Sequence, residues 1–311
     1  MRIVSLLPSA TEIVGALGLR DELVGISHCC DYPPETEGVA VVTRPATVRE
    51  AAGRADAARV QPFIDDEIGP AELDAEALRA AEPDLVIVRE RASGVGIGSR
   101  EVREALGQAA GEAHAEPVIV SLDPVSVEGI FHSITTIGAM VEAEDDAIEL
   151  LEALREEIGD LEQQVVARRD EGIRARRVVV LQAMQPPFTS GRWVPEQVRR
   201  AGGWDLLGHE GDAPALTSWE SVRDVDPQML LFAPIGMHLP AAKRAYARLE
   251  LPDFWREIEA VRTGRIFIIE PVYFERPGPR VVDGVAMLAE IFDPDGFIET
   301  SPPASWTPII E

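Results

Sequence analysis

The chain has few lysines, cysteines and aromatic residues, and it has no long apolar run. Lys243 is its one lysine, and its 29 basic residues face 54 acidic ones, which gives a formal net charge of −25. Nucleic acid is bound by clustered Lys and Arg, so this charge balance argues against a nucleic-acid partner. No apolar segment approaches the roughly 18 residues needed to cross a bilayer, so the sequence predicts no membrane insertion.

Only two cysteines occur, the neighbours Cys29 and Cys30. A disulfide between adjacent residues is strained, so no disulfide framework is expected, which fits a reducing compartment. The start of the chain lacks the basic segment and apolar stretch of a secretory leader, because residues 1–7 already have the pattern of a buried strand. We interpret the sequence as cytoplasmic as written, or as periplasmic or extracellular if a leader has been removed.

What the sequence does contain is 311 residues, 46% of them hydrophobic, which is enough for two domains. In its first part, short apolar runs alternate with helical patterns. The expected strands are residues 3–7, 24–27, 85–88 and 118–121, and the expected helices include residues 71–81 and 100–110. Ser9 and Glu12 have the spacing of a capping box at the start of a further helix. This alternation predicts a mostly parallel sheet.

A long helical region follows. Apolar residues recur at spacings of three and four in two series, which are Ile130, Ile134, Ile137 and Val141, then Ile148, Leu151, Leu154, Ile158, Leu161 and Val165. That period is helical, and residues 142–146 mark a break between two helices. We therefore predict a helical connector over residues 126–172, between an N-terminal α/β lobe of residues 1–125 and a C-terminal α/β lobe of residues 173–311.

The C-terminal lobe repeats the alternation of strands and helices. The expected strands are residues 178–181, 228–233 and 266–269, and the expected helices are residues 195–201, 219–225, 253–261 and 281–292. Ser218 is expected to cap the second of these helices, and the proline-rich tail from residue 301 is expected to be irregular. The predicted fold class is α/β, with two doubly wound lobes joined by a long helical spine.

Two motifs follow predicted strands of this lobe. They are Pro186-Pro187-Phe188-Thr189-Ser190-Gly191 and Tyr273-Phe274-Glu275-Arg276-Pro277-Gly278-Pro279-Arg280. Each places an aromatic residue beside turn-forming proline and glycine, just past a strand end, and ligands of open α/β sheets bind at that edge. The sequence has no phosphate loop, nucleophile elbow or HExxH motif, so nothing in it indicates catalysis.

Several segments together carry a family resemblance: the opening Arg2 to Glu12, the turn Asp31-Tyr32-Pro33-Pro34, the stretch Glu82 to Ile87, and the two motifs above. Over residues 2–292 the chain resembles the solute-binding proteins of vitamin B12 and iron-siderophore ABC importers. The resemblance implies two lobes with a helical spine, and capture of a corrinoid-like or ferric-siderophore-like ligand in the cleft between the lobes. It implies no catalysis and no cofactor of the protein's own. It also implies an importer permease as partner, with Glu76 and Glu220 as docking carboxylates.

The predicted ligand contacts follow the strand ends. They are Ser9, His28, Cys29, Asp31 and Arg89 in the first lobe, and Phe188, Arg192, Trp193, Met237, Tyr273, Phe274 and Arg276 in the second. Aromatic rings suit a flat macrocycle or a catecholate, and arginines pair with carboxylates or phosphates. Trp193 lies in a turn and is expected to be exposed, whereas Phe188 and Phe274 are either ligand contacts or core residues.

The first lobe departs from the pattern of the B12-binding relatives, which place aromatic residues at the ligand. The best-matching positions here hold Cys29, Arg44 and Arg89. Because side chains alternate in an extended segment, we expect Cys29 to face the ligand and Cys30 to face the interior.

An alternative reading rests on the cluster His28, Cys29, Cys30 and Asp31. Thiolate and imidazole both bind Zn, Fe or Co, so the cluster is compatible with a cytoplasmic metal-handling or corrinoid-handling protein. A structural metal site usually takes four ligands from two separated pairs, and no second cysteine pair follows. We therefore predict no metal site, with His28 and Cys29 as the candidates should one exist.

Overall fold

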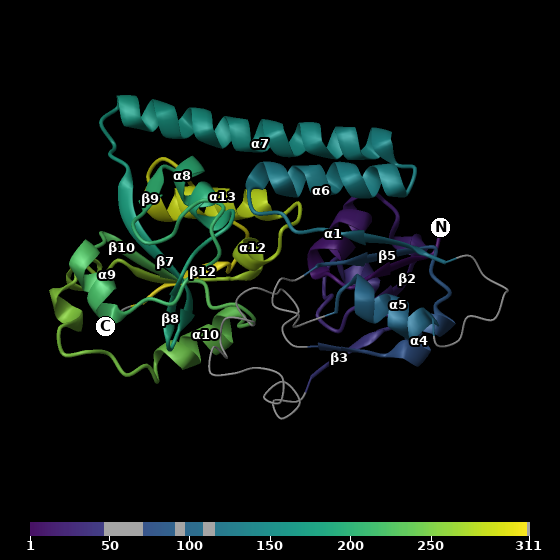
Figure 1. The fold of residues 1–311 in the computed structure, drawn as a ribbon. Coiled ribbons are helices and arrows are strands. Elements are labelled where there is room, and N and C mark those ends of the chain that lie inside the picture. The colour runs from purple at the N-terminus through teal and green to yellow at the C-terminus, as the bar shows by residue number, and fades with distance from the viewer. Residues whose placement is uncertain (47–70, 91–96, 108–115, 310–311) are drawn as a thin grey trace. The chain divides into compact units, whose positions relative to one another are not determined.

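The computed structural model describes residues 1–46, 71–90, 97–107 and 116–309 (Figure 1). The chain forms two compact units. The first unit comprises Met1–Pro124 and Gly129–Leu151, and the second comprises Val125–Glu128 and Glu152–Glu311. Two helices, α6 (Val127–Met140) and α7 (Glu144–Asp170), contribute residues to both units.

Four parallel strands form the main sheet of the first unit, in the order β2-β1-β5-β6. They are β1 (Ile3–Ser5), β2 (Leu23–Ile26), β5 (Leu85–Val88) and β6 (Val118–Ser121). Helices α1 (Pro8–Ala16), α4 (Ala75–Ala80) and α5 (Ser99–Gly107) alternate with them, and short 3-10 turns span Arg20–Glu22 and Pro34–Thr36. Every residue of β1 and β5 is buried, as expected of parallel strands covered on both faces. The predicted parallel sheet is confirmed.

Two local predictions in the first unit are wrong. Helix α1 begins at Pro8, and no side chain caps it, so Ser9 and Glu12 do not form a capping box. Proline is pre-organised for the first helical position, which explains the earlier start. Residues 71–81 are not one helix, because β4 (Ala71–Leu73) pairs with β3 (Thr43–Pro45) in an antiparallel ribbon. The helix starts only after Asp74, whose carboxylate accepts the backbone N–H of Ala77 at 2.9 Å.

The two long helices follow the predicted pattern with one change. The buried residues of α6 include Ile130, Ile134 and Ile137, and the break lies at Glu142, whose φ is +58°. In α7 the buried stripe consists of Ala147, Leu151, Leu154, Ile158, Leu161 and Val165, whereas Ile148 is 55% exposed. The assignment of Ile148 to the buried face is therefore wrong. The small Ala147 lies on the buried face instead. A Cβ added to Gly138 of α6 would stand 2.6 Å from the Ala147 Cβ, so the two helices approach too closely there for a larger side chain.

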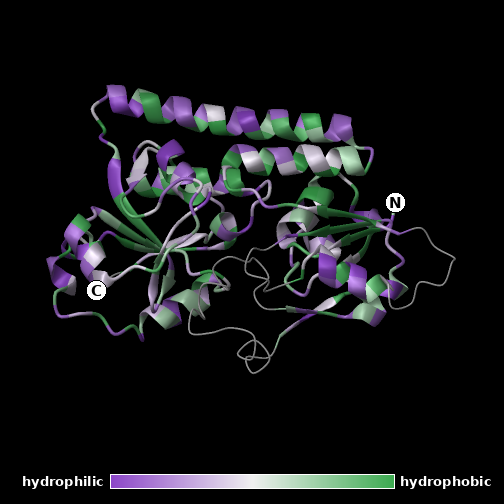
Figure 2. Ribbon diagram, viewed as in Figure 1, coloured by the Kyte–Doolittle hydropathy of each residue, from purple (hydrophilic) through white to green (hydrophobic). Residues whose placement is uncertain are grey.

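The second unit has a six-stranded mixed sheet around β7 (Arg176–Met184). Strands β10 (Met229–Phe232) and β11 (Ile266–Ile269) continue it in parallel, and β12 (Trp306–Pro308) closes that edge antiparallel. On its other side, β7 pairs with β8 (Pro187–Thr189) antiparallel and with β9 (Gly203–Asp205) in parallel. Figure 2 shows that the central strands are apolar. This agrees with the burial of every residue of β10.

Helices alternate with these strands. They are α8 (Val194–Arg200), α9 (Trp219–Val225), α10 (Leu239–Tyr246), α11 (Glu259–Arg262), α12 (Val272–Glu275) and α13 (Val281–Phe292), with a 3-10 turn over Trp255–Glu257. The capping role of Ser218 is confirmed, because its hydroxyl accepts the Ser221 N–H at 3.1 Å.

Two predictions in the second unit are wrong. The helix expected over residues 253–261 is interrupted at Ile258, which is extended and inserts its fully buried side chain into the core. The tail is not irregular throughout, since β12 pairs with β11. The motif that starts at Pro186 does lie past the end of β7, and Pro187–Thr189 turns back along that strand as β8.

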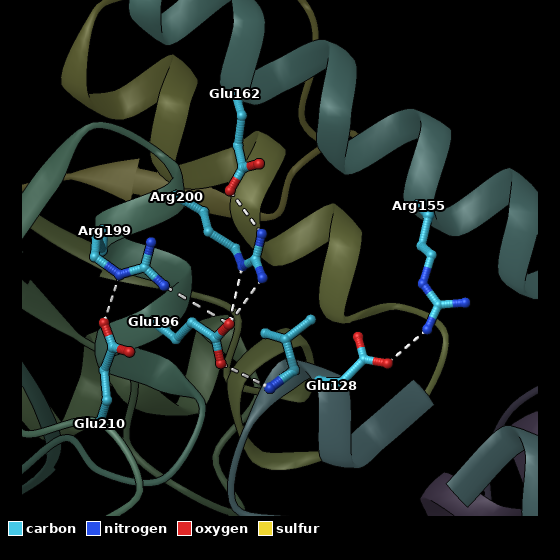
Figure 3. A network of polar contacts seen from close by, with 8 residues as sticks. Glu128, Arg155, Glu162, Glu196, Arg199, Arg200 and Glu210 are labelled. Atoms are coloured by element: carbon cyan, nitrogen blue, oxygen red, sulfur yellow. Dashed lines mark hydrogen bonds and ion pairs between the residues drawn. The ribbon is translucent and has the colours of Figure 1, made fainter. Parts of the chain in front are cut away.

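Polar side chains of α8 hold the start of α6 and the second half of α7 within the second unit (Figure 3). The Glu196 carboxylate accepts the Val127 N–H at 2.8 Å and an Arg200 N–H at 2.9 Å. Arg200 also donates to Glu162 of α7 at 2.6 Å. Val127 is the first residue of α6, so Glu196 satisfies one of the N–H groups that every helix leaves unpaired at its start.

Candidate functional site

The carboxyl ends of parallel strands meet at one edge of a sheet, so the segments that follow β1, β2 and β5 share an edge of the first unit. Ser9, in the first turn of α1, is buried. Arg89 follows β5 and is only 4% exposed. Its Nε donates to the Leu122 carbonyl at 3.4 Å and lies 3.6 Å from Asp123 Oδ1, so a guanidinium is held among residues at the ends of β5 and β6.

The segment from His28 to Asp31 follows β2 as a turn, closed by a hydrogen bond from the Cys30 N–H to the Ser27 carbonyl at 3.1 Å. The extended conformation from which we predicted the directions of Cys29 and Cys30 is therefore absent. Both cysteines are half-buried and unbridged. The Cys30 sulfur lies 3.0 Å from the buried Thr11 hydroxyl and 3.3 Å from that of Ser27.

His28 is oriented by Thr43, whose hydroxyl lies 2.7 Å from His28 Nδ1 and also accepts the His28 backbone N–H. Burial lowers the pKa of His28 below its ordinary value. Asp31 is exposed. Within the described ranges, no three His, Cys, Asp or Glu side chains come together as a possible metal site. His28, Cys29 and Asp31 therefore do not form such a group.

The corresponding edge of the second unit contains Tyr273, on α12 after β11. Tyr273 is half-buried, and the Arg280 guanidinium lies 5.5 Å from the centroid of its ring. Burial is the main reason that the pKa of Tyr273 is raised. Arg280 was not among the predicted contacts, although it ends the same motif and is the residue that precedes α13. The pair offers an aromatic surface with a cation beside it.

The loop between β10 and α10 is held by two carboxylates from the segment after β11. Glu275 accepts the Gly236 N–H at 2.8 Å, and Glu270 accepts the Leu239 N–H at 2.9 Å. His238 Nδ1 lies 2.8 Å from the second Glu270 oxygen. Met237 is thereby presented at 41% exposure. No sequence signal marked Glu270 or His238, because they are 32 residues apart and only the fold brings them together.

The prediction that Trp193 is exposed is wrong, since it is 2% exposed. A Cβ on Gly191 would lie 2.5 Å from the Asp212 carbonyl oxygen, so the chain at residues 212–214 covers the turn that precedes Trp193. Arg192 adopts φ +55°, and its N–H donates to the same Asp212 carbonyl at 2.6 Å. The remaining predicted residues Phe188, Phe274 and Arg276 are also buried, so packing in the second unit accounts for the two phenylalanines.

Glu76 and Glu220 have similar local settings in the two units. Each is exposed and lies in the first turn of a short helix, α4 or α9. Among the residues that the structure describes, neither carboxylate accepts a hydrogen bond or forms an ion pair. Both are therefore available to a partner. None of the described helices combines the length and apolar character that a membrane span requires.

Two α/β units that share a long helix define the class III solute-binding-protein fold. The model of the periplasmic binding protein family matches residues 3–273, and the chain belongs to this family. It is 25% identical over 304 residues to an uncharacterized ABC transporter substrate-binding lipoprotein of Bacillus subtilis, which covers 96% of this chain and 82% of the relative. It is 23% identical over 293 residues to the vitamin B12-binding protein of Vibrio cholerae, which covers 92% of this chain and 87% of the relative.

Solved structures share the fold. A periplasmic heme binding protein from Pseudomonas aeruginosa superposes with a TM-score of 0.70 at 22% identity, covering 94% of this chain and 93% of the other. The periplasmic vitamin B12 binding protein of Vibrio cholerae gives a TM-score of 0.64 at 20% identity, covering 94% of this chain and 96% of the other. The predicted fold class and family are confirmed.

Proposed function

We propose that the chain is the substrate-binding protein of an ABC importer and that it captures, without chemical change, a metal chelate of the corrinoid, haem or ferric-siderophore kind. Family membership supports the binding role, and the relatives named for vitamin B12 and heme support this class of ligand. The relatives named as periplasmic proteins or lipoproteins support action outside the cytoplasmic membrane.

The observation that carries the ligand class is the Tyr273–Arg280 pair at the carboxyl edge of the second sheet. A half-buried ring gives a rigid flat contact for a macrocycle or a catecholate. A guanidinium next to it binds a carboxylate through two parallel hydrogen bonds. On the first unit, Arg89 adds a cation at the equivalent edge, and the exposed ring of Tyr32 supplies an aromatic surface that the predicted contact set omitted.

These cations favour a ligand that carries carboxylates. Haem and many siderophores do so, whereas the rim of a corrin ring carries mainly neutral amides. A guanidinium loses its hydration on binding and regains most from an ionised partner. We therefore place a haem or a carboxylate-bearing ferric chelate ahead of a corrinoid.

The test is a titration of the purified chain with hemin, cyanocobalamin and a ferric carboxylate siderophore, followed by visible absorption and native mass spectrometry. We expect a one-to-one complex with at least one of them. Tyr273→Ala and Arg280→Ala should each weaken it by about 1–3 kcal/mol. Arg244→Ala is the matched control, because Arg244 is an exposed arginine on α10 outside these edges. If none of the three probes binds, the ligand class is wrong.

We also propose that Glu76 and Glu220 dock onto a permease. Their exposure, their position at helix starts and the absence of a described hydrogen bond or ion pair to either carboxylate support that role. A carboxylate without an internal partner forms its charge-assisted hydrogen bonds with another protein at no cost to the fold.

A further inference from the structure

A basic hollow lies in the second unit where α7 ends and β7 begins. Its lining includes four arginines, Arg168, Arg169, Arg174 and Arg176. The rest of the lining is largely apolar and includes Phe292. Such a gathering is unusual in a chain whose 29 basic residues are outnumbered by 54 acidic ones. We call these four residues with their apolar surroundings the basic hollow.

Two of the arginines are fixed by the fold. Arg168 donates to both carboxylate oxygens of Asp293, at 2.6 and 3.2 Å, and also to Glu171 at 2.5 Å. This pairing lowers the pKa of Asp293, so its carboxylate stays ionised and balances Arg168. Arg176 donates through Nε to the Phe292 carbonyl at 2.9 Å, which leaves its terminal N–H groups for another acceptor.

The other two arginines stand on either side of a tight turn. Gly172 adopts φ +98°, and the Ile173 N–H donates to the Arg168 carbonyl at 3.0 Å, so the chain reverses directly after α7. The reversal brings Arg169 and Arg174 to the same hollow. Both are exposed, and within the described part of the chain neither donates a hydrogen bond or forms an ion pair.

Four arginines therefore line one hollow, and the ion pairs described among them are those of Arg168 with Asp293 and Glu171. Guanidinium groups at close range repel one another, and an anion placed among them removes that repulsion. Arginine presents its N–H groups in a planar fork that matches the oxygens of phosphate.

We propose that the basic hollow binds an anionic phosphate group, either of a free phosphorylated compound or of a lipid headgroup. Arg169, Arg174 and the terminal nitrogens of Arg176 are the donors, and the Arg168–Asp293 pair holds the wall in place. None of these residues belongs to the contacts proposed for the importer ligand, so the two sites can be tested separately.

The first experiment is calorimetric titration of the intact chain with inorganic phosphate and with pyrophosphate. We expect binding that weakens with added salt, and an affinity reduced by at least about tenfold in the double variant Arg169→Ala/Arg174→Ala. The matched control is Arg256→Ala/Arg262→Ala, because both are exposed arginines of the same unit without a described ion pair. The control should bind like the unaltered chain, and all three proteins should have the same melting temperature because no removed side chain is buried.

A second experiment separates the two sources of phosphate. Sedimentation with vesicles of phosphatidylcholine alone, and with vesicles that also contain phosphatidylglycerol, tests a headgroup. Pyrophosphate binding without retention on anionic vesicles supports a free phosphorylated compound. Retention that the Arg169/Arg174 variant loses and the Arg256/Arg262 control keeps supports a headgroup. If the unaltered chain binds neither probe, or if both double variants lose binding equally, the proposal is overturned.

Discussion

The two units are both built on parallel strands with alternating helices, yet their cores are filled differently. A core cluster of the first unit is aliphatic and includes Val4 and Val86. In the second unit, Phe232 packs against Trp219 and Tyr246, with ring centroids 6.4 and 5.4 Å apart. All five tryptophans of the chain belong to the second unit. The same architecture therefore accepts a core of many small side chains or of a few large ones. The two cores should differ in how much stability they lose when one side chain is removed.

The largest effect should come from removing a ring of the second core. Phe232→Ala should lower the free energy of unfolding of that unit by about 3–5 kcal/mol, because it removes a fully buried ring and leaves a cavity. Val86→Ala in the first unit should cost about 1–2 kcal/mol, because only two methyl groups are lost. Urea unfolding followed by circular dichroism, with tryptophan fluorescence for the second unit alone, measures both. Equal losses would show that the two cores are equally tolerant.

A second pair of substitutions adds a Cβ to a glycine in each unit, at a point where another part of the chain lies close to that glycine. Gly191→Ala in the second unit should cost about 2–3 kcal/mol, because its Cβ would lie 2.5 Å from the Asp212 carbonyl and 2.6 Å from the Pro214 nitrogen, both backbone atoms. Gly138→Ala in the first unit should cost less, about 1–2 kcal/mol, because helices can shift to relieve contact with Ala147. Gly159→Ala is the control.

Gly159→Ala should stabilise the protein by about 0.5–1 kcal/mol. Gly159 lies inside α7, and an added Cβ would have no other atom within 4 Å. Thermal denaturation of the three variants tests the order. A Gly138 variant less stable than the Gly191 variant would contradict it.

The units should also respond to pH with opposite sign. Burial lowers the pKa of His28 below 6.5, so the unfolded chain binds that proton more readily and the first unit loses stability as pH falls through 6.5. Burial raises the pKa of Asp205 above 3.8, although Ser190 donates to it at 2.6 Å. The folded second unit therefore binds that proton more tightly and loses stability as pH rises above 3.8.

Hydrogen exchange between pH 4 and pH 7 measures, for each unit separately, the slope of its stability against pH. His28→Gln should flatten the slope of the first unit, and Asp205→Asn should flatten that of the second. A shared slope that neither substitution changes would rule out both groups as its source.

The smallest effect on the isolated protein should come from Glu76→Ala and Glu220→Ala. Both side chains are exposed, so the melting temperature and the affinity for the importer ligand should stay the same. Ligand-stimulated ATP hydrolysis by a reconstituted permease should fall in each variant and fall furthest in the double variant. The exposed Glu149→Ala, on α7, is the control. Unchanged stimulation in the double variant would remove both residues from the docking surface.

The sequence alone determined the elements whose signal is local. Strands β5, β6 and β11 and helices α9 and α13 begin and end where the apolar pattern placed them. In β5, β11 and the two helices, burial on both faces or along one stripe explains the pattern, because it selects apolar residues in a run or every three to four residues. The family also followed from short local motifs, which the match over residues 3–273 confirms.

Only the tertiary structure decided what depends on distant partners. Residues 71–73 became a strand because Thr43–Pro45 pairs with them, and Trp193 became buried because residues 212–214 cover its turn. Likewise, the bracing of Gly236 by Glu275 and the contact of His238 with Glu270 carry no periodic signature. Backbone pairing and side-chain contact act between residues far apart in the chain, so their energies override local propensity without leaving a trace in the neighbouring sequence.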